Sequence, residues 1–129
     1  MIGPSLQYTD ERFSARAEYF FYYEQNEQRI HAAYVEAAYF LTKKLQVGAR
    51  GELYGLHVLE AAVSSSLFDH KEVAATVNYW FDPGLVVKLS VHAVDGNRFA
   101  QPAVLDDALL NGTLKRSTLA TILGMQFSF

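Results

Sequence analysis

The last thirteen residues alternate strictly between two kinds of side chain, and this pattern limits the possible folds more than any other feature. Residues on one side are mostly large and apolar: Leu119, Thr121, Leu123, Met125, Phe127 and Phe129. Those on the other side are Ala120, Ile122, Gly124, Gln126 and Ser128. A period of two predicts a β-strand rather than a helix. About ten residues suffice for a tilted strand to cross a bilayer, so this strand is long enough to span one. We expect its final aromatic residue to lie at the membrane interface.

The composition is compatible with strands that have one apolar side. Hydrophobic residues make up 50% of the 129 residues, yet the mean hydropathy is only +0.01. No apolar run approaches 18 residues, so no transmembrane helix is expected. The net charge of −3 without a basic cluster argues against nucleic acid as a partner. The absence of cysteine excludes disulfides and thiolate metal sites. These totals fit a membrane barrel, a soluble sandwich or a lipocalin-like barrel.

Six clear segments, and a shorter one before them, share this period of two. The fold class that they predict is all-β, an antiparallel up-and-down meander of six or seven strands that forms a single barrel segment over residues 1–129. The expected strands are Ser5–Asp10, Phe13–Glu24, Arg29–Thr42, Leu45–His57, Lys71–Phe81, Leu85–Asp95 and Ser117–Phe129. A helix is a serious rival over residues 29–42, because Ala and Glu are good helix formers.

Short and long connections alternate along the chain. The tight turns are Glu11–Arg12, Thr42–Lys44 and Asp82–Gly84, and the last combines Pro and Gly in the order that a turn requires. The longer connections are Gln25–Gln28, Val58–His70 and Gly96–Arg116, and we expect a helical turn at residues 106–112 in the last of these. This alternation is typical of bacterial outer-membrane barrels, in which short periplasmic turns alternate with long external loops.

Four stretches resemble the C-terminal part of Gram-negative outer-membrane porins, in the broad group that includes the phosphate-selective type. They read ARAEYFFYY, YVEAAYFLTKKLQVGARGELY, VAATVNYWFDPGLVVKLSVHAVDGNRF and LGMQFSF. The resemblance implies an outer-membrane channel without enzymatic activity or cofactor, often a trimer, through which small hydrophilic solutes diffuse passively. Its partners are then membrane lipid and these solutes.

The chain departs from that family in two ways. Known single-chain bacterial barrels have at least eight strands, and the start of this chain, MIGPSLQYTDERF, lacks the basic and apolar regions of a signal peptide. We therefore expect the sequence to be part of a longer chain.

The alternation also predicts which residues face the lumen and which face lipid. The expected pore-lining residues are Arg16, Glu18, Glu36, Arg50, Glu52, Lys88 and His92. An aromatic girdle at the periplasmic interface is expected from Phe13, Tyr39, Tyr79, Phe81, Phe127 and Phe129. The cationic residues could attract anions, while the neighbouring acidic ones argue against strong anion selectivity. Cross-strand pairing that only holds the sheet together is an equally good interpretation of these charges.

Other interpretations have weaker support. The four histidines, His31, His57, His70 and His92, show no metal-ligand spacing, so we expect no metal site. Residues 64–66 with Asp69 and His70 contain the residue types of a catalytic triad, but loop composition explains them better. The adjacent Asp106 and Asp107 are better read as a solvated acidic loop than as a cation site, and Trp80 as a rim anchor rather than a stacking platform.

Two other functions stay open. The first is a soluble β-barrel that binds an apolar ligand, in which the apolar sides of the strands would point inward. The second is an outer-membrane enzyme that acts on lipid, for which the sequence offers no convincing catalytic set.

Overall fold

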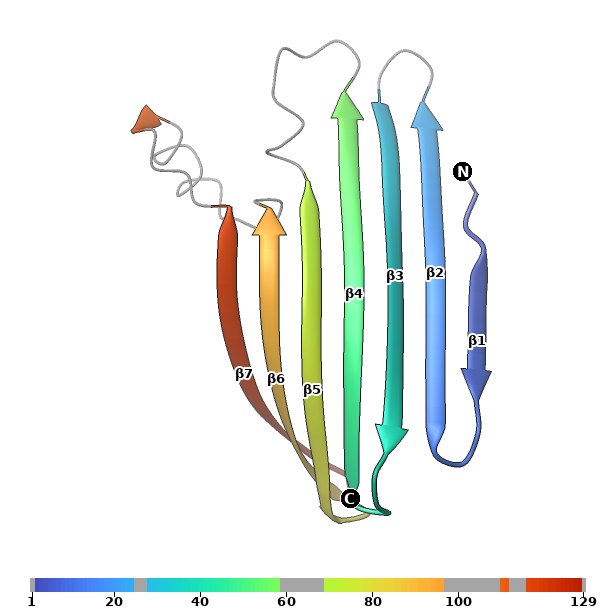
Figure 1. Cartoon of the computed structure of the whole chain (residues 1–129), viewed down its shortest axis with the longest axis vertical. Coiled ribbons are helices and arrows are strands. Elements are labelled where there is room, and N and C mark those ends of the chain that lie inside the picture. Colours follow the sequence, from blue (N-terminus) through green and yellow to red (C-terminus); the bar gives the residue numbers. More distant parts are fainter. Residues whose placement is uncertain (1, 25–27, 59–68, 97–109, 112–115, 129) are drawn as a thin grey trace.

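Seven antiparallel strands form one sheet in which sequence neighbours are always spatial neighbours (Figure 1). The computed structural model describes residues 2–24, 28–58, 69–96, 110–111 and 116–128. The strands are β1 (Ser5–Thr9), β2 (Phe13–Glu24), β3 (Gln28–Phe40), β4 (Leu45–Val58), β5 (His70–Asp82), β6 (Leu85–Gly96) and β7 (Ser117–Phe127). The all-β, up-and-down meander predicted from the sequence is therefore confirmed.

The observed strand bounds differ from the predicted ones by two residues or fewer. Residues 28–40 form a strand rather than the rival helix, because both neighbouring strands pair with them along their whole length. One small difference matters for the chemistry: His70, which the sequence placed in a long connection, is the first residue of β5. The helical turn expected at residues 106–112 falls largely outside the described residues.

A side-chain oxygen closes each of the three short turns. At the β1–β2 turn, Asp10 Oδ1 accepts hydrogen bonds from the backbone N–H groups of Arg12 and Phe13, at 2.8 and 2.7 Å. Thr42 Oγ1 does the same at the β3–β4 turn, and Asp82 Oδ1 accepts one from the Gly84 N–H, at 2.8 Å. Such side chains replace the hydrogen bonds that the ladder cannot supply where the chain reverses. The three short turns lie at the same end of the sheet (Figure 1).

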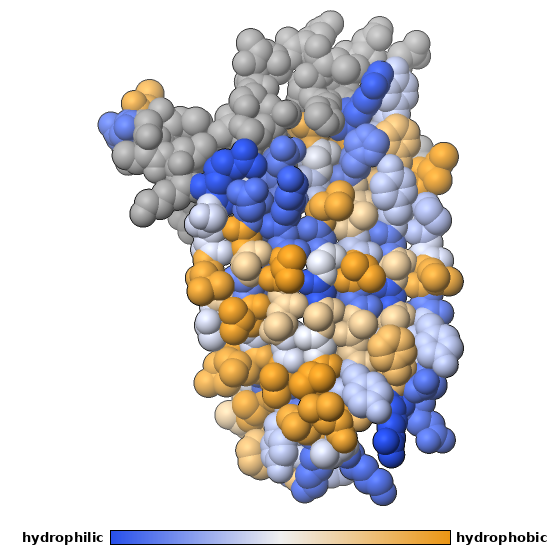
Figure 2. Space-filling model, in the orientation of Figure 1, coloured by the Kyte–Doolittle hydropathy of each residue, from blue (hydrophilic) through white to orange (hydrophobic). Residues whose placement is uncertain are grey.

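The two faces of the sheet differ sharply in chemistry. On the apolar face, a row that crosses all seven strands consists of Leu6, Ala17, Val35, Gly51, Val73, Ala93 and Leu119. The neighbouring row on the opposite face, called the polar face from here on, includes Gln7, Arg16, Glu36, Arg50 and His92. Figure 2 views the apolar face, where hydrophobic residues cover the middle and the end near the short turns.

The described part of the sheet has almost no hydrophobic core. Its only buried hydrophobic residues are Ala74 and Val86, while large apolar side chains such as Leu123 and Val73 are 74% and 67% exposed. The sheet is also curved, and the lower ends of β6 and β7 pass behind β5 in Figure 1. The apolar face, which is turned toward the viewer, is therefore convex at this corner.

We expect Asp10→Ala to lower stability in a pH-dependent way. Hydrogen bonds from the backbone N–H groups of Arg12 and Phe13 hold the pKa of Asp10 below its ordinary value. A depressed folded-state pKa means that the stabilisation is complete above the ordinary Asp pKa of about 3.9 and is lost as the pH falls through the folded-state pKa. Urea unfolding of the protein in detergent should therefore show a lower midpoint for the variant near neutral pH. The difference should shrink in acid, and a pH-independent difference would contradict the assignment.

Candidate functional site: a network of charges on the polar face

All seven residues predicted to line a pore lie on the polar face. Arg16 is opposite Glu36, and Glu36 is opposite Arg50. The remaining members of the set project from β2, β4 and β6 on the same side: Glu18, Glu52, Lys88 and His92. The register thus brings these side chains from four strands (β2, β3, β4 and β6) onto one surface. Whether that surface lines a channel stays a prediction.

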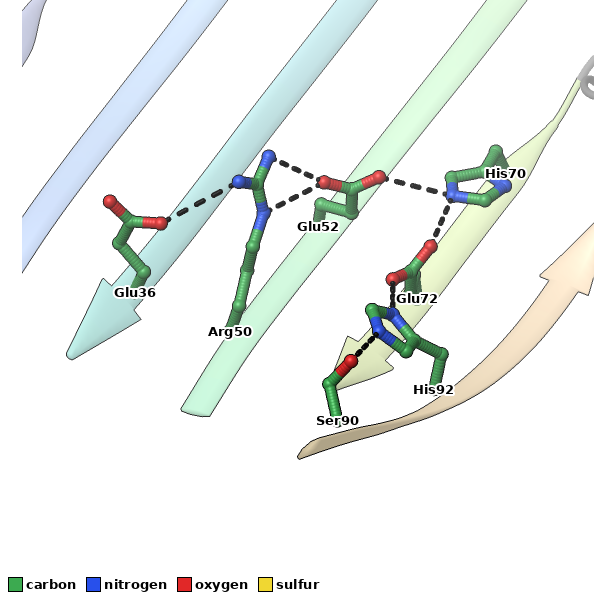
Figure 3. A network of polar contacts seen from close by, with 7 residues as sticks. All are labelled: Glu36, Arg50, Glu52, His70, Glu72, Ser90 and His92. Atoms are coloured by element: carbon green, nitrogen blue, oxygen red, sulfur yellow. Dashed lines mark hydrogen bonds and ion pairs between the residues drawn. The ribbon is translucent and has the colours of Figure 1, made fainter. Parts of the chain in front are cut away.

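Four strands contribute to one continuous network of polar contacts on this surface (Figure 3). Arg50 is its only guanidinium. It lies 3.5 Å from Glu36 Oε2 on β3 and 2.7 Å from Glu52 Oε2 on its own strand. The guanidinium also lies over the ring of Tyr34, 4.6 Å from the ring centroid, an arrangement in which the ring face attracts the cation. Arg50 therefore links β3 to β4 and fixes one oxygen of Glu52.

Glu52 and Glu72 are directly opposite each other on β4 and β5. Like charges at directly opposed positions destabilise a sheet, and a hydrogen-bond donor between the two carboxylates reduces their repulsion. His70 occupies that place: its Nε2 is 3.1 Å from Glu52 Oε1 and 3.3 Å from Glu72 Oε2. The side chain of His70 is only 4% exposed, so the contact is made largely out of water.

The second oxygen of Glu72 is held from the other side. His92 on β6 donates from Nδ1 to Glu72 Oε1, at 2.5 Å, and its Nε2 lies 2.8 Å from the hydroxyl of Ser90. A carboxylate can only accept hydrogen bonds, so Nδ1 of His92 carries a proton. In the neutral ring, Nε2 of His92 then accepts a hydrogen bond from the Ser90 hydroxyl. The network therefore extends from Glu36 on β3 to Ser90 on β6.

Smaller contacts complete the polar face. Arg16 pairs with Glu18 on its own strand, and its guanidinium lies 5.7 Å from the centroid of the Tyr34 ring. Lys88 Nζ donates to Gln126 Oε1 at 2.8 Å and so joins β6 to β7. Trp80 packs on Phe40 with ring centroids 5.3 Å apart, and its role as a rim anchor stays a prediction.

Among the predicted aromatic residues, Phe13 and Tyr39 are directly opposite each other on β2 and β3, but those on β5 and β7 lie at other levels of the ladder. Phe13 is level with Val77 on β5 and Leu123 on β7, as the pairings through the intervening strands show. The aromatic residues Phe81 and Phe127 lie four residues further toward the short-turn end of their strands. The line of aromatic side chains therefore slopes across the strands. Tyr39 and Tyr79 belong to it, whereas Phe129 lies outside the described residues.

Sequence reasoning missed Glu72, Ser90 and the role of His70. His70 and Glu72 are two residues apart and so share a face once both belong to a strand. The predicted strand began at Lys71, one residue too late, and thereby left His70 off that face. The pairing of Glu52 with Glu72 also depends on the register across a long connection, which the sequence alone does not set.

Two further sets of candidate residues belong to connections. Residues 64–66, which loop composition explains better than a catalytic triad, lie outside the described residues, and so do Asp106 and Asp107. His70 itself contacts Glu52 and Glu72. No helix in the described part of the chain is long and apolar enough to cross a membrane.

In comparisons with known proteins, no family model, curated protein or solved structure matched the chain. The resemblance to porins thus stays an expectation from the sequence.

Gly96 allows β6 to approach the start of β5, and we expect Gly96→Ala to be destabilising. Its φ is +135°, and an added Cβ would lie 2.1 Å from the Asp69 carbonyl oxygen and 2.8 Å from the His70 Cα. The backbone conformation alone costs about 1–3 kcal/mol for a residue with a side chain. The free energy of unfolding in detergent should fall by at least this amount.

Gly124→Ala is the matched control for this substitution. It lies on β7, and a Cβ added there meets nothing within 4 Å, so its stability should be close to that of the wild type. Equal effects of the two substitutions would contradict the proposed close approach at Gly96.

Proposed function

We propose that the chain forms part of the wall of an outer-membrane β-barrel channel through which small hydrophilic solutes diffuse passively. In this arrangement the apolar face contacts lipid and the polar face lines a water-filled lumen. The division of the sheet into two chemically distinct faces, without a core between layers, carries the proposal.

The exposed apolar side chains support contact with lipid. A sheet in water buries its apolar face against a second layer, and contiguous apolar patches larger than a few hundred Å² are rare on soluble monomers. Here the apolar side chains of all seven described strands are at least partly exposed, up to 75% at Leu6. Lipid tails would cover them without any second layer.

The curvature supports lipid contact over the binding of an apolar ligand in a soluble barrel. A ligand inside a barrel contacts its concave side. The apolar face is convex where β6 and β7 curl behind β5 (Figures 1 and 2), so the concave side carries the charges. This is the arrangement of a barrel with a polar interior.

The slope of the aromatic line supports a tilted arrangement in a membrane. Phe81 and Phe127 lie four residues, at about 3.3 Å each, beyond the level of Phe13. Phe13 is three strand spacings from Phe81 and five from Phe127, at about 4.8 Å each, which corresponds to a slope of about 30–40°. Strands of outer-membrane barrels tilt by about 35–45°. Aromatic residues that lie at one membrane depth would therefore occupy sloping positions in the ladder, as these do.

Hydrophobic side chains form a band across the apolar face, and the border of this band nearest the long connections slopes in the same direction. Lys71 on β5 is level with Tyr19 on β2, yet apolar and aromatic side chains continue on β2 as far as Tyr23. Lys71 is opposite Asp95 on β6, and hydrophilic residues gather at this end of the band in Figure 2. The band between the two borders keeps a nearly constant width, as a bilayer requires.

The charges of the predicted lumen favour weak rather than strong selectivity. On the polar face, three cations (Arg16, Arg50 and Lys88) accompany four carboxylates (Glu18, Glu36, Glu52 and Glu72), so the formal charges nearly cancel. Charges of both signs on one wall create a transverse field that orders polar solutes and water. A closed barrel also needs more strands than the seven described, because lipid does not tolerate open sheet edges. Further strands or further copies of the chain would supply them.

A matched pair of lysine substitutions tests which face contacts lipid. Thr121 and Ala120 are neighbours on β7 but lie on the apolar and polar faces, respectively. Lysine near the midplane of the lipid face costs about 2–4 kcal/mol, so Thr121→Lys should reduce the free energy of unfolding in lipid vesicles by this amount. Ala120→Lys should have a small effect. Equal effects of the two substitutions, or a larger effect of Ala120→Lys, would contradict the proposed orientation.

Conductance tests the channel itself. The natural protein, purified from its own cells and added to planar bilayers, should produce discrete current steps. Arg50→Gln should raise the permeability of cations relative to anions, because one positive charge leaves the lumen. Two charges in contact in water interact by about 1 kcal/mol, so the permeability ratio should change by less than about tenfold.

Arg29→Gln is the control for the conductance experiment, because Arg29 lies on the apolar face opposite Tyr23. It should leave the permeability ratio unchanged. The absence of current steps from protein that is folded and inserted would refute the channel, and an equal change in the Arg29 variant would refute the assignment of faces.

A further inference from the structure

We propose that Glu52, His70 and Glu72 bind one divalent transition-metal ion, with zinc as the ion of best fit. Each of the three residues offers one ligand atom, and these atoms lie within 4.8 Å of one another. The atoms in contact are Oε1 of Glu52, Nε2 of His70 and Oε2 of Glu72. The site lies on the polar face, where β5 begins, and does not depend on whether that face lines a channel.

The spacing of the three atoms fits a metal ion. Ligands about 2.0–2.1 Å from a tetrahedral zinc ion lie about 3.3 Å from one another. His70 Nε2 is already 3.1 Å from Glu52 Oε1 and 3.3 Å from Glu72 Oε2. An ion that replaces the proton between these atoms would require only small movements of the side chains.

Both carboxylates present one oxygen to the site because their other oxygen is held elsewhere. Arg50 binds Oε2 of Glu52, at 2.7 Å, and leaves Oε1 toward His70. His92 binds Oε1 of Glu72 and leaves Oε2 toward His70. Outer hydrogen bonds of this kind orient the ligands in protein metal sites. Figure 3 shows that Glu52 and Glu72 each turn one oxygen toward His70 and the other toward Arg50 or His92.

The charge of the network matches a divalent cation. Its three carboxylates, Glu36, Glu52 and Glu72, and one guanidinium, that of Arg50, sum to a formal charge of −2 when the imidazoles are neutral. Side chains of Glu72 and His70 are only 18% and 4% exposed, so water screens this charge poorly. A bound Zn²⁺ would bring the sum to zero and would separate the two opposed carboxylates.

The ligand types favour zinc over magnesium or calcium. Imidazole nitrogen suits zinc and its neighbours in the periodic table, whereas magnesium and calcium prefer oxygen ligands alone. Three protein ligands also leave a position for water or another small ligand. Since Glu52 is on β4 and the other two are on β5, the ion would link two strands beside their long connection.

The test is a metal titration of the natural-length protein, purified in detergent and freed of metal with a chelator. Titration with ZnCl₂ in competition with a chromophoric chelator should show one ion per chain, and CoCl₂ should produce the visible absorption of a nitrogen- and oxygen-ligated Co²⁺. His70→Ala and Glu72→Gln should weaken Zn²⁺ binding by at least about 100-fold. His92→Ala, which removes a positioning residue, should weaken it by about 10–100-fold.

His31→Ala is the matched control, because His31 lies on the apolar face beside Tyr19. It should leave Zn²⁺ affinity unchanged. Circular dichroism establishes that each variant is folded, and Glu72→Gln, which keeps the side-chain shape, provides the result if His70→Ala does not fold. Unchanged affinity in folded Glu72→Gln, equal loss in His31→Ala, or equal affinity for Zn²⁺ and Mg²⁺ would overturn the proposal.

Discussion

The register of the antiparallel ladder is the constraint on which the rest of the structure depends. A slip of one residue in any strand would move its whole set of apolar side chains to the other face. From β2 to β7 the pairing continues without such a slip, apart from an irregularity between Trp80 and Asp82 beside a turn. The side-chain oxygens of Asp10, Thr42 and Asp82 help to fix the chain reversals. Both the apolar band and the charged network follow from this register.

Much of the fold, but less of the candidate site, could be predicted from the sequence. Strand positions follow from the period of two, and the tight turns follow from residues such as Pro83 and Gly84, because both signals are local. The contact of His70 with Glu52 is not local: it depends on how the strands pair across a connection of more than ten residues. A predicted strand that began one residue too late was enough to hide His70. The placement of seven charged or titratable residues on one face was predictable, but their partners were not.

The described strands have almost no buried core, so their surroundings must provide much of the stability. In water, side chains such as Leu123 and Phe127 would be largely exposed, at 74% and 63%, and each would favour aggregation or a covering partner. In lipid those side chains are already in an apolar solvent, so backbone hydrogen bonds and contacts between neighbouring side chains hold the strands together. The polar network would add cross-links between strands in both settings, because its contacts extend from β3 to β6.

The short β1 strand has a consequence for how the sheet comes apart. It pairs with β2 over five residues, with one further bridge between Ile2 and Phe21, whereas β3 pairs with β4 over thirteen. Separation of strands removes hydrogen bonds in proportion to the length paired, so within the described sheet the seam between β1 and β2 is the weakest. Amide protons along that seam are therefore those that solvent reaches first, and a sideways pull on the sheet would open it there before any other seam.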